Sequence, residues 1–393
     1  MELTRKQEEG LKIVLDRYKS GEKYATIAGY AGTGKSTLVR FIVEALGVDE
    51  SKVCYAAFTG KATEVLRKKG NKNAVTLHKL LYDFFPRPTG GFVRRPKMQL
   101  DYSVVVVDEI SLAPKSMLKM LLNHKVFAIF LGDPGQLPVI EKKEAHDFLE
   151  HPHIFLDEVM RQAAESEIIR LTMKIRNGES IPIMNGKEVI VIPRKELVTG
   201  HLTWADSIIT ATNVTRHGIT QQMRGILGFE GALCEGEKVI CKRNYWEDCN
   251  NEGDALVNGT IGKVENCFES FVRIPSYIKN DRHDLPTVMC EIVPDTGSPF
   301  SGVNIDKDFL LKEAPCVDWR VAYQIGRLRE RIGDILPRQI TYGYAITCHS
   351  AEGSEWSKVL TIEENFPFNR EEHKQWLYTA ATRAADKLVL VRS

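Results

Sequence analysis

The sequence predicts an α/β protein in which strands and helices alternate along most of the chain. Apolar runs such as residues 104–107 end in polar or glycine residues and lead into helical patterns, as the strands of parallel sheets do. A length of 393 residues exceeds one ordinary core, so we expect two or three domains. Between Gly236 and Arg338 short β-like runs separated by turn residues replace the alternation, which predicts a small β-barrel inserted in the second domain.

Residues 24–40, YATIAGYAGTGKSTLVR, combine a short strand, a glycine turn and the start of a helix. Gly29, Gly34, Lys35 and Ser36 fit G-x-x-x-x-G-K-[ST] at every fixed position. The N–H groups of such a turn converge on a β-phosphate at the positive end of the helix. Lys35 would neutralise β- and γ-phosphate oxygens, and Ser36 would ligate Mg²⁺. A chance glycine turn does not account for this pattern, so we expect nucleotide binding.

A second buried strand ends in two acids, within VVVVDEIS. Asp108 would hold Mg²⁺ opposite Ser36, directly or through water, and Glu109 is placed to orient and deprotonate the attacking water. Gln136, after a further strand at residues 127–131, is placed to sense the γ-phosphate. Gln7, on the first turn of a helix predicted over residues 3–17, suits the edge of an adenine, although a solvated glutamine is the alternative.

Two segments suit contact with nucleic acid. The strand at residues 53–58 runs into Thr59, Gly60 and Lys61, whose hydroxyl, glycine and ammonium fit a passing phosphate backbone. His78 opens another helix, where a capping or core histidine is the alternative. Residues 84–96, FFPRPTGGFVRRP, predict a protruding hairpin whose aromatics would stack on bases, unless its phenylalanines pack on the domain.

Composition narrows the class of protein. With 43% hydrophobic and 27% charged residues the chain is typical of a soluble globular protein, and no aliphatic run is long enough for a bilayer, so we expect a cytoplasmic protein without a membrane partner. A net charge of +1 means that nucleic-acid binding must come from local arrangement. The eight cysteines form no C-x-x-C pair, which favours reduced thiols over a metal cluster.

Taken in order, the motifs resemble those of superfamily 1 DNA helicases, in the RecD-like and Dda-like branch that moves 5′ to 3′ on single-stranded DNA. They are GYAGTGKST, AFTGKAT, TLHKLL, VVVVDEIS, GDPGQLPV, LDEVMRQ, ATNVTR, AITCHSAEGSEW and WLYTAATRA, and they extend over essentially the whole chain. The resemblance implies two RecA-like P-loop NTPase domains, with ATP between them and DNA across their tops. We place them at residues 1–148 and at 149–234 with 339–393. It further implies an SH3-like domain at 235–338, facing a pin hairpin at about 82–100 across the DNA.

The resemblance also implies residue roles. Arg161 and Arg383 would reach the γ-phosphate as arginine fingers, with surface salt bridges as the alternative. The implied nucleotide contacts are Gln7, Gly32, Thr33, Gly34, Lys35, Ser36, Thr37 and Glu355. The implied DNA contacts are Thr59, Lys61, His78 and Phe92 of the first domain and Asn213, Arg216, Thr347 and His349 of the second. Tyr378 is expected to pack rather than to contact ligand.

One departure from the family pattern lies next to His349, one of the residues implied to contact DNA. Relatives commonly carry Lys-Ser-Gln-Gly after the histidine equivalent to His349, whereas here Ser350, Ala351 and Glu352 precede Gly353. Loss of a lysine and gain of a carboxylate should weaken phosphate contact there. Two placements of Glu352 stay open: it faces the ATP cleft, or it pairs with an arginine.

We therefore expect ATP hydrolysis, with Mg²⁺, coupled to movement along single-stranded DNA and to unwinding of forked or tailed duplexes by a monomer. Replication, recombination or repair proteins are candidate partners. Three alternatives stay open: a P-loop small-molecule kinase, a single-strand translocase that does not separate duplexes, and a nucleic-acid-binding scaffold with a vestigial ATPase. ATPase measurements with and without single-stranded DNA separate the kinase and the scaffold from the motor.

Overall fold

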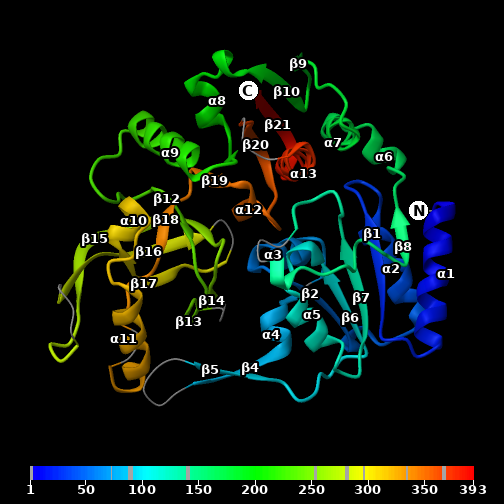
Figure 1. Cartoon of the computed structure of the whole chain (residues 1–393), viewed down its shortest axis with the longest axis horizontal. Coiled ribbons are helices and arrows are strands. Elements are labelled where there is room, and N and C mark those ends of the chain that lie inside the picture. Colours follow the sequence, from blue (N-terminus) through cyan, green and yellow to red (C-terminus); the bar gives the residue numbers. More distant parts are fainter. Residues whose placement is uncertain are drawn as a thin grey trace. The chain divides into compact units, whose positions relative to one another are not determined.

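The computed structural model describes residues 3–71, 73–86, 92–138, 142–251, 255–278, 283–294, 297–332, 335–364 and 369–393. These residues form two compact units (Figure 1). Unit 1 comprises Met1–Tyr82, Pro96–Asn213 and Ile346–Ser393, and unit 2 comprises Asp83–Arg95 and Val214–Ala345. Within the described ranges, none of the helices has the length and apolar character that crossing a membrane requires.

Unit 1 contains two sheets, of which the first has six strands paired in parallel throughout. In spatial order its strands are β3 (Val75–Thr76), β2 (Val53–Ala57), β6 (Val104–Asp108), β7 (Phe127–Gly132), β1 (Tyr24–Gly29) and β8 (Ile154–Leu156). The helices of this part are α1 (Arg5–Lys19), α2 (Lys35–Leu46), α3 (Gly60–Lys68), α4 (Leu77–Leu81) and α5 (Lys115–Leu121). This sheet and its helices form the first lobe of unit 1. The first lobe continues past the boundary expected at residue 148, because β8 pairs with β1.

The continuous apolar run of β6 reflects helices on both faces of this sheet. Val105 and Val107 enter one core with Leu118 of α5. Val104 and Val106 enter the opposite core, to which α1 and α2 contribute. A strand that is covered by helices on both faces exposes no face to solvent, so its residues need not alternate between apolar and polar. The buried strand predicted at residues 104–107 is confirmed.

The second sheet of unit 1 also has six strands among the described residues; β11, β20, β21 and β10 are paired in parallel, and β9 is antiparallel to β10. In spatial order they are β19 (Ala345–Thr347), β11 (Ser207–Thr210), β20 (Trp356–Ile362), β21 (Ala384–Arg392), β10 (Val189–Pro193) and β9 (Met184–Asn185). The accompanying helices are α6 (Arg161–Ala164), α7 (Glu167–Asn177), α8 (Thr199–Trp204), α12 (Cys348–Ala351) and α13 (Arg370–Ala381). The mixed α/β class and its parallel sheets are thus confirmed.

Unit 2 is built on a five-stranded antiparallel sheet, as the turn-rich segment predicts. Its order is β17 (Phe300–Asp306), β16 (Asp284–Pro294), β15 (Ile261–Arg273), β12 (Lys238–Cys241) and β18 (Ile340–Tyr342). A short pair, β13 (Tyr245–Cys249) and β14 (Ala255–Leu256), and three helices, α9 (Asn213–Leu227), α10 (Lys307–Lys312) and α11 (Trp319–Ile332), complete its inserted part. The hairpin β4 (Tyr82–Pro86) and β5 (Phe92–Pro96) also groups mainly with this unit.

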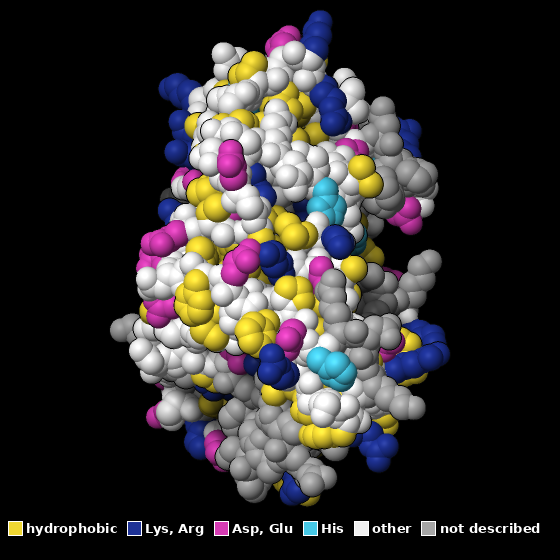
Figure 2. Space-filling view, turned by 90° about the vertical axis from the view of Figure 1, so that its left-hand side faces the viewer, with side chains coloured by type: hydrophobic (Ala, Val, Ile, Leu, Met, Phe, Trp, Pro, Cys, Tyr) yellow, Lys and Arg dark blue, Asp and Glu magenta, His cyan; other side chains and the backbone are white. Residues whose placement is uncertain are grey.

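The inserted part begins about one helix earlier than the sequence suggested. Arg224 of α9 donates from Nε to Glu237 Oε1 at 2.7 Å, and the side chains are only 8% and 0% exposed. This buried pair ties α9 to the start of β12, so α9 belongs with the insertion. On the face drawn in Figure 2, basic and acidic side chains are interspersed, as a net charge of +1 leads one to expect.

Candidate functional site

The phosphate loop follows β1 and leads into α2. Gly32 and Gly34 have φ of 76° and 80°, in the left-handed region that glycine adopts without strain. Gly29 has no room for a side chain, since a Cβ there would lie 2.9 Å from Leu156 O. Lys35 donates from Nζ to Gly29 O at 2.7 Å and to Tyr30 O at 3.1 Å. The loop thus has the tight backbone that brings N–H groups close to a phosphate.

The two acids stand at the carboxyl end of β6, beside the loop. Burial and the Glu109 carboxylate raise the pKa of Asp108 to about 6, while Lys35 opposes the shift. Glu109 has φ of 52°, rare for a residue with a side chain and frequent at functional sites. Its N–H donates to Asp108 Oδ1 at 2.9 Å. The Asp108 carboxylate and the Ser36 hydroxyl are the kinds of oxygen ligand that Mg²⁺ prefers.

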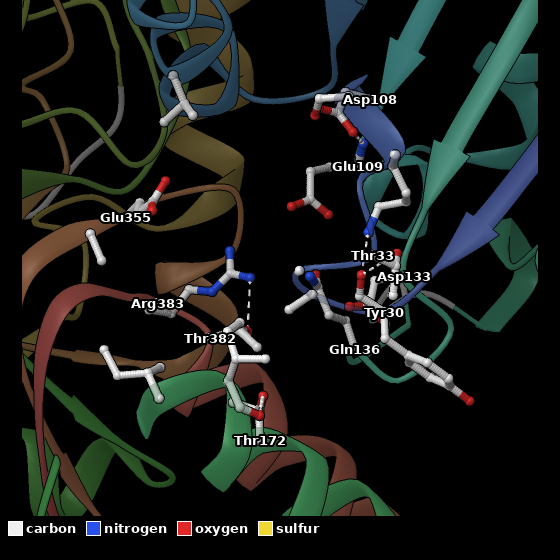
Figure 3. Close-up of a pocket in the computed structure, with 18 of the residues that line it drawn as sticks. Tyr30, Thr33, Asp108, Glu109, Asp133, Gln136, Thr172, Glu355, Thr382 and Arg383 are labelled. Atoms are coloured by element: carbon white, nitrogen blue, oxygen red, sulfur yellow. Dashed lines mark hydrogen bonds between the residues drawn. The ribbon is translucent and has the colours of Figure 1, made fainter. Parts of the chain in front are cut away.

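Gln136 connects the first sheet to an arginine of the second. In the amide orientation that satisfies both partners, it donates to Glu109 Oε2 at 3.2 Å and accepts from Arg383 Nη2 at 3.1 Å. Arg383 is 4% exposed and is held by Thr379 O at 3.1 Å from Nε and Ser354 O at 3.3 Å from Nη1. Figure 3 shows Arg383 facing Gln136 and Glu109 across the cavity. The predicted acid, glutamine and arginine therefore do converge.

These groups line a cavity of about 540 Å³. Of the residues predicted to contact nucleotide, metal or the γ-phosphate, those lining it are Gly32, Thr33, Gly34, Lys35, Ser36, Thr37, Asp108, Glu109, Gln136, Glu355 and Arg383. The sequence reasoning missed Asp133, Thr382 and the α7 residues Ile168, Ile169 and Thr172, which also line it. Asp133 lies inside the quoted motif GDPGQLPV, but α7 carries no motif that could have indicated its position.

The roles predicted for Gln7 and Arg161 at the nucleotide stay predictions. Gln7 is 1% exposed, and its Oε1 accepts from Thr4 N at 3.0 Å in a capping box. Its Nε2 lies 3.4 Å from Thr33 O and from Gly34 O, so here the amide supports the phosphate loop. An adenine contact by Gln7 stays a prediction. Arg161 begins α6, and its side chain lies outside the described part, so its predicted role also stays a prediction.

The predicted DNA contacts of the first lobe follow β2 and open α4. Thr59 caps α3 by accepting from Ala62 N at 3.1 Å, and Lys61 pairs with Glu64 at 3.4 Å. The ring of His78 lies 5.7 Å from that of Phe58. The side chain of Phe92, in the hairpin, is outside the described part.

The residues of the second domain that are predicted to contact DNA lie at two helices, α12 and α9. Thr347 and His349 lie at α12, and burial lowers the pKa of His349. Asn213 begins α9. Arg216, however, is 2% exposed and pairs with Glu313. Its guanidinium is thus buried against a carboxylate, and a DNA contact by Arg216 stays a prediction.

Glu352, the departure from the family pattern, lies close to the cavity without lining it. Its Oε1 is buried and meets no hydrogen-bond partner among the described residues. Burial raises its pKa to about 8, with Arg383 opposing the shift and Glu109 adding to it. The charges of Arg383 and Glu109, which line the cavity, thus act on the Glu352 carboxyl, and both placements predicted for it stay predictions.

Comparison with known proteins gives matches over both halves of unit 1. Residues 2–189 match a family described as an AAA domain, and residues 342–391 match the UvrD-like helicase C-terminal domain. The chain is 25% identical over 405 residues to the ATP-dependent RecD2 DNA helicase of Deinococcus radiodurans, covering 95% of this chain and 47% of that protein. It is 31% identical over 192 residues to the ATP-dependent DNA helicase dda of Enterobacteria phage T4, covering 45% and 43%. The chain thus spans less than half the length of these two relatives.

The fold has solved counterparts. The crystal structure of Bacteroides Pif1 bound to ssDNA superimposes with a TM-score of 0.52 at 18% identity, over 100% of this chain and 92% of that one. In this chain a phosphate loop and paired acids on one parallel sheet face an arginine that follows a helix of a second sheet. In sequence the chain is therefore similar to the DNA helicases RecD2 and dda, and in fold it is similar to Bacteroides Pif1.

Proposed function

We propose that the chain is an ATP-dependent DNA helicase that moves 5′ to 3′ along single-stranded DNA and unwinds duplexes. The observation that carries the proposal is the hydrogen-bonded series Glu109, Gln136 and Arg383, which joins the proposed water-activating acid of one lobe to the arginine of the other. A γ-phosphate in the cavity would be contacted from both lobes at once. Its loss on hydrolysis would remove that shared contact and let the lobes separate.

The residues of the cavity fit ATP with Mg²⁺. Backbone N–H groups of residues 32–37 would bind phosphate oxygens, with Lys35 adding charge. Ser36 and Asp108 would hold Mg²⁺, which when bound neutralises phosphate charge. Glu109 would accept a proton from the attacking water, and Arg383 would stabilise charge on the γ-phosphate, with Arg161 as the second candidate.

The DNA track would cross the carboxyl ends of both parallel sheets. Thr59, Lys61, His78 and Phe92 of the first lobe, and Asn213, Thr347 and His349 of the second, are the proposed contacts. We assign the β4–β5 hairpin as the pin and the five-stranded sheet of unit 2 as the SH3-like domain. The relatives named as DNA helicases support a DNA substrate, with a monomer acting on single strands and forked or tailed duplexes beside replication or recombination proteins.

Steady-state ATPase with and without single-stranded DNA tests the proposal. We expect strong stimulation by DNA in the wild type and loss of turnover in K35A, since the lysine charge at the phosphates is removed. Duplexes with a 5′ or a 3′ tail then test unwinding and polarity. ATPase that ignores DNA contradicts a motor, translocation without unwinding identifies a pure translocase, and a preference for 3′ tails contradicts the polarity.

A further inference from the structure

Tyr378 of α13 is buried, at 2% exposure, yet its hydroxyl is engaged on both sides. The O–H donates to Asp133 Oδ2 at 2.7 Å. The same oxygen accepts from the N–H of Ala31, in the phosphate loop, at 3.0 Å. One hydroxyl of the second lobe thus joins two separate loops of the first. Packing alone, which the sequence favoured, does not require these bonds.

Thr379, the next residue of α13, makes a further hydrogen bond to the loop that contains Asp133. Thr379 Oγ1 accepts from the N–H of Leu137 at 2.9 Å. Between the two bonded points, Gly135 lies so close to the tyrosine ring that a Cβ there would be 3.1 Å from Tyr378 Cε1. The loop Asp133–Leu137, which carries Gln136, is therefore fitted to α13 over two successive residues.

Arg383 is hydrogen-bonded both to α13 and to this loop. Arg383 follows α13 by two residues and its Nε donates to Thr379 O at 3.1 Å. Gln136, from the fitted loop, accepts from the same guanidinium at 3.1 Å. Helix, loop and arginine are consequently held by one set of bonds, and Tyr378 is the member that extends it to the phosphate loop.

We propose that Tyr378 is a positioning residue for ATP hydrolysis, because its hydroxyl sets the placement of Gln136 and Arg383 relative to the phosphate loop. The inference rests on the proposed ATPase. A phenylalanine would keep the packing and lose both bonds, leaving the Ala31 N–H and one Asp133 oxygen without this partner. Asp133 would keep the N–H of Gly135, at 2.8 Å, as a donor. Misplacement of a γ-phosphate group lowers the rate more than it lowers nucleotide affinity.

The test is Y378F, assayed for DNA-stimulated ATPase and for equilibrium binding of a non-hydrolysable ATP analogue. We expect kcat to fall on the order of tenfold while the Kd of the analogue stays within about twofold. The matched control is Y342F, which removes another buried tyrosine hydroxyl, bonded to Ala232 O in unit 2. Y342F should lose thermal stability without losing kcat.

A kcat of Y378F within about twofold of wild type, or an equal fall in Y342F, overturns the inference. Should Y378F not fold, T379V removes the acceptor of the Leu137 N–H and must show the same separation of kcat from Kd, and equal kcat there also overturns it. Absence of ATPase in the wild type would instead contradict the proposed function, so the two failures are distinguishable.

Discussion

At the scale of single residues, Glu352 places a carboxyl where an ionised group is poorly solvated. Its pKa is raised to about 8, first by burial and then by Glu109, with Arg383 acting against the rise. A raised carboxyl pKa means that the folded state holds the proton more tightly than the unfolded state. The stability that this proton supplies is therefore full below the ordinary glutamate pKa and is lost as the pH rises through about 8.

The variant E352Q should remove this pH dependence, because glutamine has no proton to lose. We expect E352Q and wild type to melt at similar temperatures near about pH 5, and E352Q to be the more stable, by on the order of a few kcal/mol, near about pH 8. Thermal melting across this range measures the difference, with E355Q at an exposed neighbour as control. Parallel curves for E352Q and wild type would contradict the assigned ionisation.

Arg383 lies at the end of the series that crosses the cavity. R383A should lower kcat by about 10³-fold, as loss of an arginine finger does, with little change in nucleotide affinity. R383K should not restore it, since an ammonium cannot make the bonds of a planar fork. Single-turnover ATPase measures the effect, and R370A, at the exposed first residue of α13, is the control. Near-normal turnover of R383A would show that another group stabilises the phosphate charge.

The residues that sequence could place are those whose role depends on the local chain. Lys35, Asp108 and Gln136 each follow a strand of one sheet, and strand order brings their ends together. The partners of Arg216 and Tyr378 could not be predicted, because they lie at distant positions that carry no sequence signal for the pairing. Arg216, for example, meets Glu313 of a separate helical segment.

At the scale of elements, the Arg224–Glu237 ion pair is one of the buried contacts that attach α9 to unit 2. Arg224 also donates to Gly231 O at 3.0 Å and lies 4.6 Å from the ring centre of Tyr342. Helical periodicity predicts the helix but not the partner of a buried arginine. The boundary expected at residue 235 was therefore one helix late.

Removing one partner of this pair should leave a buried charge uncompensated. We expect R224A to lose about 3–5 kcal/mol of unfolding free energy in a urea titration. R320A, at an exposed arginine of α11, should stay within about 0.5 kcal/mol of wild type. A loss in R224A no larger than that in R320A would mean that the Arg224–Glu237 pair adds little to the attachment of α9.

At the scale of the whole molecule, a net charge of +1 leaves no global field to attract DNA. Under the proposed function, affinity for DNA would come from local contacts at the ends of the parallel strands, and each phosphate contact would add to the salt dependence of binding. The α/β class, the sheets and the inserted β-structure could all be predicted, because hydrophobic periodicity reports them. The grouping of the hairpin with unit 2 could not, since it depends on contacts between segments far apart in the chain.

The variant K61A should weaken binding to single-stranded DNA evenly across sequences and reduce the slope of log K against log salt by about 1. Lys61 is also paired with Glu64 at 3.4 Å, so part of its charge is already compensated. Fluorescence anisotropy over a salt series measures the slope, with K119A on the exposed surface of α5 as control. An unchanged slope would remove Lys61 from the phosphate contacts.

The chain leaves the second sheet of unit 1 after β11 and returns to it at β19, and these two strands are neighbours. Hydrogen bonds hold the chain where it leaves β11 and where it enters β19. Thr210 Oγ1 lies 3.4 Å from Ile346 O, and the Glu364 carboxylate accepts from Ala211 N at 2.8 Å. Asn213 and Thr347, two proposed DNA contacts, adjoin the two crossings. Under the proposed function, a force on the DNA at these residues would act directly at two of the covalent connections between the units, the other two being at the ends of the β4–β5 hairpin.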